Sequence, residues 1–211
     1  MFWIYPEKKY NQIPFSCYDG SESSHFCQKG ENWGAFTTQE CDLIISFSQN
    51  LFKEKSHRFE GLQQNYRQAN AWEISQTEAT NWLWQRLINN LITANNRWWN
   101  YDLVGIIEPL QLLCYDSTNN NNNQIKDNCD LHIDNEYPFS CRKISFSVEL
   151  SDPKIYEGAK LNLYLQENPP ILPRNRGTMI MFPSFLLHEV TPIVEGKRWE
   201  LIGWISGPQF R

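Results

Sequence analysis

The second half of the chain consists of short extended runs, and this pattern restricts the fold more than any other feature of the sequence. In KISFSVEL (143–150) apolar and polar residues alternate strictly. A period of two is typical of a β-strand, because successive side chains point to opposite faces of the sheet. Similar runs, separated by turn residues, are EPLQLLCY, AKLNLYL, GTMIMFP and RWELIGWI. A series of short strands of this kind predicts a sandwich or barrel.

Two amphipathic helices are predicted before these strands, with a short strand at 66–74 between them. Thr37 and Glu40 have the spacing of a capping box, in which each side chain bonds a free amide of the first helical turn. The expected apolar face of this helix is Leu43, Ile44, Phe47 and Leu51. The second helix is predicted from about Thr77, a candidate cap, to about Trp98. Its expected buried stripe is Trp82, Leu83, Leu87, Leu91 and Ile92.

These elements predict one domain of 211 residues, mostly β, with N-terminal helices that support a jelly roll. Residues 1–35 are expected to form an irregular segment, residues 36–100 the helical support and residues 101–211 the jelly-roll core. An Asn run (119–123) predicts a loop between two strands.

Charge and cysteine usage narrow the classes of partner and compartment. The net charge of −5 argues against nucleic acid as a partner. The apolar runs are too short for a membrane span, and the first residues do not resemble a secretory signal. The six cysteines form no CxxC pair, so we expect reduced thiols and a cytoplasmic protein. Cys17, His25 and Cys27 have the wrong spacing for a zinc finger, which favours an ordinary loop.

Three residues of the β half are candidates for binding a metal. His132 precedes Asp134 by two residues, so on an extended segment both side chains point the same way. His188 follows much later, after the hydrophobic run MFPSFLL. Two imidazoles and one carboxylate on one face of a metal leave positions open, as in non-haem Fe(II) oxygenases. A His–x–Asp pair alone is common, and by itself it is more consistent with ordinary surface or core residues.

Two further residues make the pattern more specific. Arg198 follows His188 by ten residues, and a turn at Glu195–Gly196 is expected to fold the next strand back beside the one that ends at His188. A guanidinium at this place is the natural partner for a carboxylate. Tyr115 ends the run EPLQLLCY, and its hydroxyl is a second candidate donor to the same carboxylate.

With these motifs in order, residues 101–207 resemble the prolyl 4-hydroxylase-like branch of the Fe(II)/2-oxoglutarate dioxygenases, in particular the bacterial PKHD-type hydroxylases. The matching stretches are LQLLCY, HIDN, RKISFSVELSDPKIYEGAKLNLY and RGTMIMFPSFLLHEVTPIVEGKRWELIGW. The helical part, from FTTQECDLII to WWNYDLVGIIEPLQ, occurs in the same order as in that family.

The resemblance implies a cupin-like double-stranded β-helix with Fe(II) on His132, Asp134 and His188. It implies that Arg198, assisted by Tyr115, binds the far carboxylate of 2-oxoglutarate. Further cavity-lining residues implied by the resemblance are Ser147, Leu161, Val190 and Trp204. Glu149 stands where many relatives have an aromatic residue, and we expect it outside the site because it would repel a carboxylate.

The implied reaction converts 2-oxoglutarate and O2 to succinate and CO2 while hydroxylating a second substrate, with ascorbate as an additional candidate cofactor. A peptidyl residue of the prolyl type is the first candidate substrate. A free amino acid or a specialised metabolite is the alternative within the enzymes, and a jelly-roll binding protein without catalysis is the alternative outside them.

Overall fold

The computed structural model describes residues 15–18, 35–50, 54–55, 67–118, 127–165 and 169–209. The helices are α1 (Thr38–Asn50) and α2 (Asn81–Trp98). The strands in chain order are β1 (Ser16–Tyr18), β2 (Glu54–Lys55), β3 (Arg67–Gln68), β4 (Asn70–Ile74), β5 (Leu110–Asp116), β6 (Asn128–His132), β7 (Arg142–Glu149), β8 (Tyr156–Gly158), β9 (Leu161–Leu163), β10 (Met179–Pro183), β11 (His188–Val190) and β12 (Ile193–Ser206).

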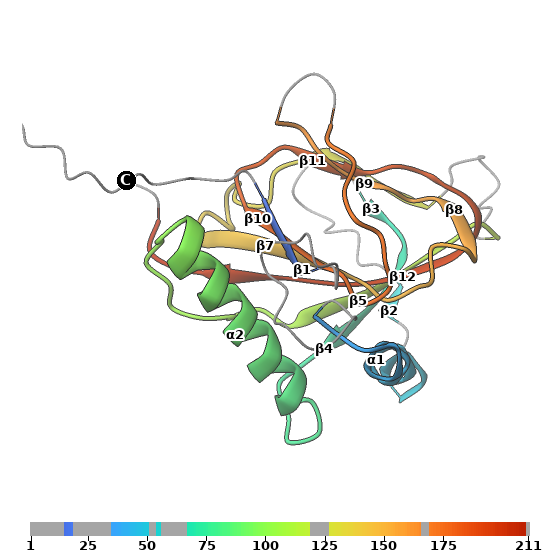
Figure 1. Ribbon diagram of the computed structural model, residues 1–211, viewed down its shortest axis with the longest axis horizontal. Helices are drawn as coiled ribbons and strands as arrows, with labels where there is room; N and C mark the ends of the chain where they lie inside the picture. The colour runs from blue at the N-terminus through green and yellow to red at the C-terminus, as the bar shows by residue number, and fades with distance from the viewer. Residues whose placement is uncertain are drawn as a thin grey trace, which may run out of the picture.

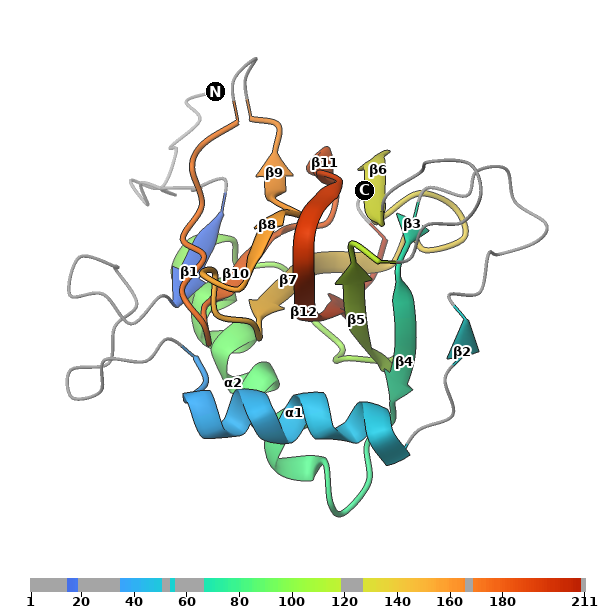
Figure 2. The same cartoon turned by 90° about the vertical axis from the view of Figure 1, so that its right-hand side faces the viewer.

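The strands form a large and a small antiparallel sheet. The large sheet has the order β1-β10-β7-β12-β5-β4-β2, with β8 paired to the first part of β12, and the small sheet has the order β3-β6-β11-β9. Both helices cover one face of the large sheet, and the small sheet lies across its other face (Figures 1 and 2). The predicted jelly roll is therefore confirmed.

Both faces of the central strand β7 are buried. Ile144, Phe146 and Val148 pack into the core between the large sheet and the helices. The alternating residues, among them Ser145 and Ser147, are also buried, and Ser145 contacts Asp134, which follows β6 of the small sheet. The strict alternation in the sequence thus separates an apolar core from a polar interior between the two sheets.

Helix α1 begins as the sequence predicts. The amide of Thr37 donates to Glu40 Oε2 at 2.9 Å, and the amide of Glu40 donates to Thr37 Oγ1 at 3.2 Å, which completes the capping box. Ile44 is buried as expected, but the side chain of Leu43 is 47% exposed. The prediction for Leu43 is wrong because Cys41 and Ile44 point at the sheet, and Leu43 lies beside that stripe.

Helix α2 begins later than predicted, at Asn81. The Thr77 hydroxyl accepts the amide of Thr80 in the turn before the helix and does not cap its first turn. The stripe of Leu83, Leu87 and Leu91 is buried as predicted. Ile92 is 42% exposed, because the stripe continues through Ala94 and Asn95 on the other side of Leu91.

Two other expectations are corrected. Residues 16–18 of the N-terminal segment are not irregular, since they add strand β1 beside β10. Glu195–Gly196 is not a hairpin turn: β12 continues through it, pairing first with β8 and then with β5 and β7. Gly196 has φ +77°, which bends the strand without reversing it. β12 therefore belongs to the large sheet, and β11 pairs with β6 and β9 instead of with β12.

His25, Cys27 and the Asn run 119–123 lie outside the described residues, so the alternative zinc site and the predicted loop are not placed. Neither described helix combines the length and apolar character needed to cross a membrane.

Candidate metal centre

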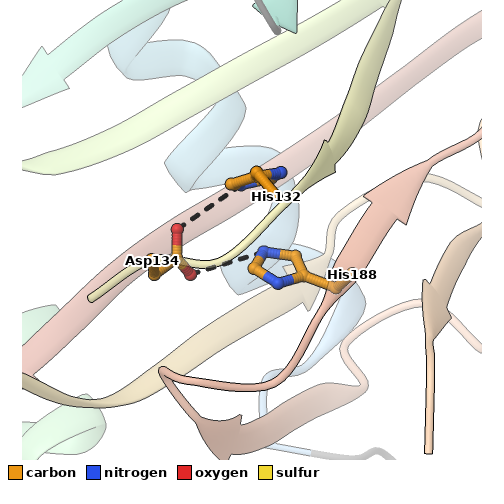
Figure 3. A group of neighbouring side chains, drawn as sticks. All are labelled: His132, Asp134 and His188. Carbon is orange, nitrogen blue, oxygen red and sulfur yellow. Dashed lines mark ion pairs between the residues drawn. The ribbon is translucent and has the colours of Figure 1, made fainter. Parts of the chain in front are cut away.

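The three predicted metal ligands converge where two strands of the small sheet meet. His132 ends β6, His188 begins β11, and the two are direct partners in the antiparallel ladder. Asp134 follows β6, and its amide donates to the carbonyl of Ser184 at 2.9 Å. Figure 3 shows the Asp134 carboxylate between the two imidazoles.

The spacing of the ligand atoms fits a single ion. His132 Nε2 lies 3.5 Å from Asp134 Oδ1, and His188 Nε2 lies 3.4 Å from Asp134 Oδ2. One ligand atom from each of the three residues lies within 4.8 Å of the others. When two ligand atoms each lie about 2.1 Å from an ion and form a right angle at it, the two atoms are about 3 Å apart. Two neutral imidazoles and a carboxylate are also the donor set that suits Fe(II).

The backbone orients both imidazoles for metal binding. His132 Nδ1 lies 2.7 Å from the carbonyl oxygen of Asp130, and His188 Nδ1 lies 2.8 Å from that of Leu186. A carbonyl oxygen can only accept, so each Nδ1 carries a proton, and each Nε2, the nitrogen left for a metal, faces Asp134. Such contacts hold metal-binding histidines in one tautomer. The carbonyls of Asp130 and Leu186 could not be identified from the sequence.

Electrostatics keep the aspartate ionised. Burial acts to raise the pKa of Asp134, but His188, His132 and the Ser145 hydroxyl together hold it well below its usual range. Burial lowers the pKa of His188, which favours its neutral form. Burial also acts to lower the pKa of His132, but Asp134 and Cys129 outweigh it and raise that pKa to about 10. An ion must therefore displace a proton from His132.

Two residues of β7 hold Asp134 in place. The Ser145 hydroxyl donates to Asp134 Oδ2 at 2.6 Å. Arg142 donates to the carbonyl of Asp134 at 3.3 Å and pairs with Glu108. The sequence analysis missed these residues as partners of the metal ligand, although the alternation of β7 placed Ser145 on the same face as Ser147.

Replacing Ser145 with alanine is expected to weaken Fe(II) binding roughly 10–100-fold, the usual effect of losing a partner of a metal ligand. Anaerobic Fe(II) titration without added oxo acid measures this. Ser147→Ala is the matched control, because the Ser147 hydroxyl donates to Glu200 and not to Asp134. Equal Fe(II) affinities for the two variants would contradict a positioning role for Ser145.

Arg198 is buried and already bound to two carboxylates. Its Nε donates to Glu149 Oε2 at 2.8 Å, and its Nη1 and Nη2 donate to the two oxygens of Glu200 at 3.0 and 2.9 Å. Glu149 was expected outside the site, and this is wrong: it contacts the predicted anchor directly. The sequence analysis missed Glu200, although it lies two residues after Arg198 and therefore on the same face of the strand.

The other residues of this cluster come from three strands. The Tyr156 hydroxyl donates to Glu149 Oε2 at 2.8 Å, and the Ser147 hydroxyl donates to Glu200. Tyr115 is the cross-strand partner of Arg198, whose guanidinium carbon lies 5.7 Å from the centre of the tyrosine ring. Burial raises the pKa of Glu149, which Arg198 acts to lower.

A cavity of about 410 Å³ reaches this cluster. Ser147, Leu161 and Arg198, three of the residues expected to line a cavity, border it together with Glu149. The inward residues Ser145, Ser147 and Glu149 follow one another on β7 at steps of roughly 6.6–6.8 Å. One polar strand face therefore leads from Asp134 to Arg198.

The remaining predicted cavity residues lie elsewhere in the interior. Val190 packs in a buried cluster with Tyr115 and Ala159. Trp204 covers Arg142, whose guanidinium carbon lies 3.6 Å from the centre of the indole. Neither residue borders the cavity beside Arg198.

Comparison with curated proteins supports the resemblance found in the sequence. No family model matches the chain. A PKHD-type hydroxylase of Prochlorococcus marinus (strain MIT 9211) is 34% identical over 77 residues, which is 36% of this chain and 35% of the relative. A PKHD-type hydroxylase of Rippkaea orientalis is 33% identical over 79 residues, 36% of each chain. The match thus spans about a third of the length of these relatives.

Solved structures are similar over most of the chain. A Pseudomonas putida prolyl-4-hydroxylase superposes with a TM-score of 0.64 at 15% identity, over 92% of this chain and 93% of the other. A Trichoplax adhaerens prolyl hydroxylase, solved with a peptide fragment of a hypoxia inducible factor, gives 0.66 at 19% identity, over 92% and 84%. The chain therefore has the double-stranded β-helix fold of these hydroxylases, and its local sequence similarity is to PKHD-type hydroxylases.

Proposed function

We propose that the protein is an Fe(II)- and 2-oxoglutarate-dependent dioxygenase that hydroxylates a peptidyl residue of the prolyl type. The observation that carries this proposal is the convergence of His132, Asp134 and His188, with both Nε2 atoms turned to the same carboxylate. The fold and the names of the curated relatives support the same class of reaction.

Bound Fe(II) would supply oxygen activation, coupling decarboxylation of 2-oxoglutarate to succinate and CO2 with hydroxylation of a C–H bond. His132, Asp134 and His188 would hold the ion, and Ser145 would orient the aspartate. The cavity beside Ser147 and Leu161 would receive the co-substrate, with Arg198 as the partner of its far carboxylate. The protein itself would supply orientation and a dry interior.

The peptide substrate is supported by a neighbour and by the surface near the ligands. The Trichoplax adhaerens prolyl hydroxylase was solved with a peptide. In this chain Leu131 and Leu187, each adjacent in sequence to a metal ligand, are 49% and 39% exposed, and Tyr137 is 86% exposed. Exposed apolar side chains of this kind suit contact with a polypeptide more than with a small polar substrate.

Succinate release is expected with a pool of proline-containing peptides and not with free amino acids, in the presence of Fe(II), 2-oxoglutarate and O2. A polypeptide must lie across an open groove, whereas a small-molecule enzyme encloses its substrate. Mass spectrometry of the peptides should show the addition of one oxygen. Turnover with free amino acids alone would replace the peptide by the alternative substrate class. A lack of succinate above the metal-free control with every substrate would favour a binding protein.

We also propose that the protein resides in the cytoplasm. Cys41, Cys129 and Cys141 are free thiols, which is typical of proteins in reducing compartments.

A further inference from the structure

The anchor proposed for the far carboxylate of 2-oxoglutarate carries an excess of negative charge from the chain itself. Arg198 contributes one positive charge, while Glu149 and Glu200 contribute two negative charges when both are ionised. All three residues are at least 95% buried. With both glutamates ionised, these three side chains by themselves carry a net charge of −1 at the point where the cavity reaches them.

A third carboxylate at this cluster meets repulsion that one guanidinium does not offset. Ionised carboxylates that share a buried site raise one another's affinity for a proton, commonly by about one to three pKa units. Carboxyl groups in water ionise with pKa values of about 4, so 2-oxoglutarate arrives fully charged at neutral pH. The proton needed to relieve the repulsion must then reside on the two glutamates.

We infer that Glu149 and Glu200 determine which 2-oxo acid the pocket accepts, and that an acid with a far carboxylate binds together with one proton taken up by this glutamate pair. The inference rests on the proposed function and adds to it the control of co-substrate binding. Each glutamate accepts three hydrogen bonds, but Arg198 donates one charge-assisted bond to Glu149 and two to Glu200, so Glu149 is the better acceptor for the proton. Burial, which raises the pKa of Glu149, acts in the same direction.

The other charged or titratable groups around the pair come from every neighbouring element. They are Tyr156 on β8, Tyr115 on β5, Cys41 on α1, and Lys160 and Arg174 at the cavity wall. Burial raises the pKa of Tyr156 and of Cys41 to about 12, and raises that of Tyr115 above its usual value, so these three stay neutral at pH 6–8.5. Lys160 and Arg174 carry an ammonium and a guanidinium group, which have no lone pair that could accept a further proton. The glutamate pair is thus the group of this cluster that can take up a proton there.

The affinity for 2-oxoglutarate is therefore expected to fall as the pH rises. The protonated pair binds the far carboxylate, so raising the pH above the pKa of the free pair lowers the apparent affinity up to tenfold per pH unit. 2-Oxopentanoate is the matched probe, because it has the same keto acid end and a methyl group in place of the far carboxylate. The affinity for 2-oxopentanoate should not depend on the protonation state of the glutamate pair.

The experiment is anaerobic calorimetry on the Fe(II)-loaded protein at pH 6–8.5, in buffers that differ in ionisation enthalpy. The ratio of the two affinities isolates the far carboxylate, because both probes share the metal-binding end. In the wild type we expect the affinity for 2-oxoglutarate, relative to that for 2-oxopentanoate, to fall as the pH rises. At the alkaline end of the range, binding of 2-oxoglutarate should take up about one proton and binding of 2-oxopentanoate none. In Glu149→Gln the ratio should be roughly tenfold or more higher at pH 8.5 and nearly independent of pH.

Glu157→Gln is the matched control, since it removes the same charge from an exposed position of β8 outside the cluster. Glu200→Gln provides a second variant, and the proton count in the wild type requires no variant at all. A wild-type ratio independent of pH, without proton uptake, would overturn the inference and leave the proposed function standing. Failure of both oxo acids to bind at every pH would overturn both.

Discussion

Asp134→Ala is expected to abolish Fe(II)-dependent turnover, with a loss of more than about a thousandfold. Loss of a partner of a metal ligand costs about 10–100-fold, and loss of a charged ligand exceeds that. Asp134 lies between His132 and His188 and offers one oxygen to each imidazole. Without it the site keeps two neutral donors and no charge to offset that of the ion. Succinate release and Fe(II) titration measure the two consequences.

Asp130→Ala is the matched control, because Asp130 lies four residues before Asp134 in the same segment and its exposed carboxylate accepts a hydrogen bond from the side chain of Asn128. The contact of Asp130 with His132 uses its backbone carbonyl, which the substitution retains. An Asp134→Ala protein that folds and still turns over at the rate of Asp130→Ala would refute the metal assignment.

Arg198→Ala is expected to have the largest effect on stability, lowering the free energy of unfolding by about 3–5 kcal/mol at neutral pH. The reason is the two carboxylates that it leaves behind. Glu149 and Glu200 are buried, and removal of the guanidinium leaves them without their positive partner. For a chain of this length the melting temperature should fall by roughly 6–20 °C.

The pH dependence of this loss tests its cause. Unpaired buried carboxyls have pKa values above those of the unfolded chain, so the folded variant binds more protons and its stability falls as pH rises. The difference from wild type in denaturant unfolding should therefore be larger at pH 8 than at pH 5.5. The triple variant with Glu149→Gln and Glu200→Gln should recover part of the loss. A loss below about 1 kcal/mol that does not vary with pH would show that the charges are not the cause.

Local spacing was enough to predict the principal strands and the shared face of His132 and Asp134, whereas the full set of candidate ligands was predicted from the resemblance. His132 and Asp134 lie two residues apart on an extended segment, so their side chains share a face whatever surrounds them. The alternation in β7 likewise predicted which of its side chains lie together on one face of the strand. Glu200 could have been recognised by the same rule, because it occupies the face of Arg198.

The partners of Arg198 depended on tertiary structure. Glu149 was expected to lie outside the site because its carboxylate would repel that of a bound ligand. The fold instead brings β7 and β12 side by side with Glu149 opposite Glu200, so the chain supplies carboxylates of its own. No property of either segment alone specifies that register.

By itself, the sequence determined the alternating strands, the capping box of α1 and the shared face of His132 and Asp134, because each depends on the geometry of a few neighbouring residues. Only the tertiary structure decided that β12 continues through Gly196 into the large sheet, that backbone carbonyls of Asp130 and Leu186 orient the imidazoles, and that Glu149 and Glu200 hold Arg198. Each of these depends on the pairing of segments distant in sequence or on the path of the backbone. Side-chain periodicity carries no information about either.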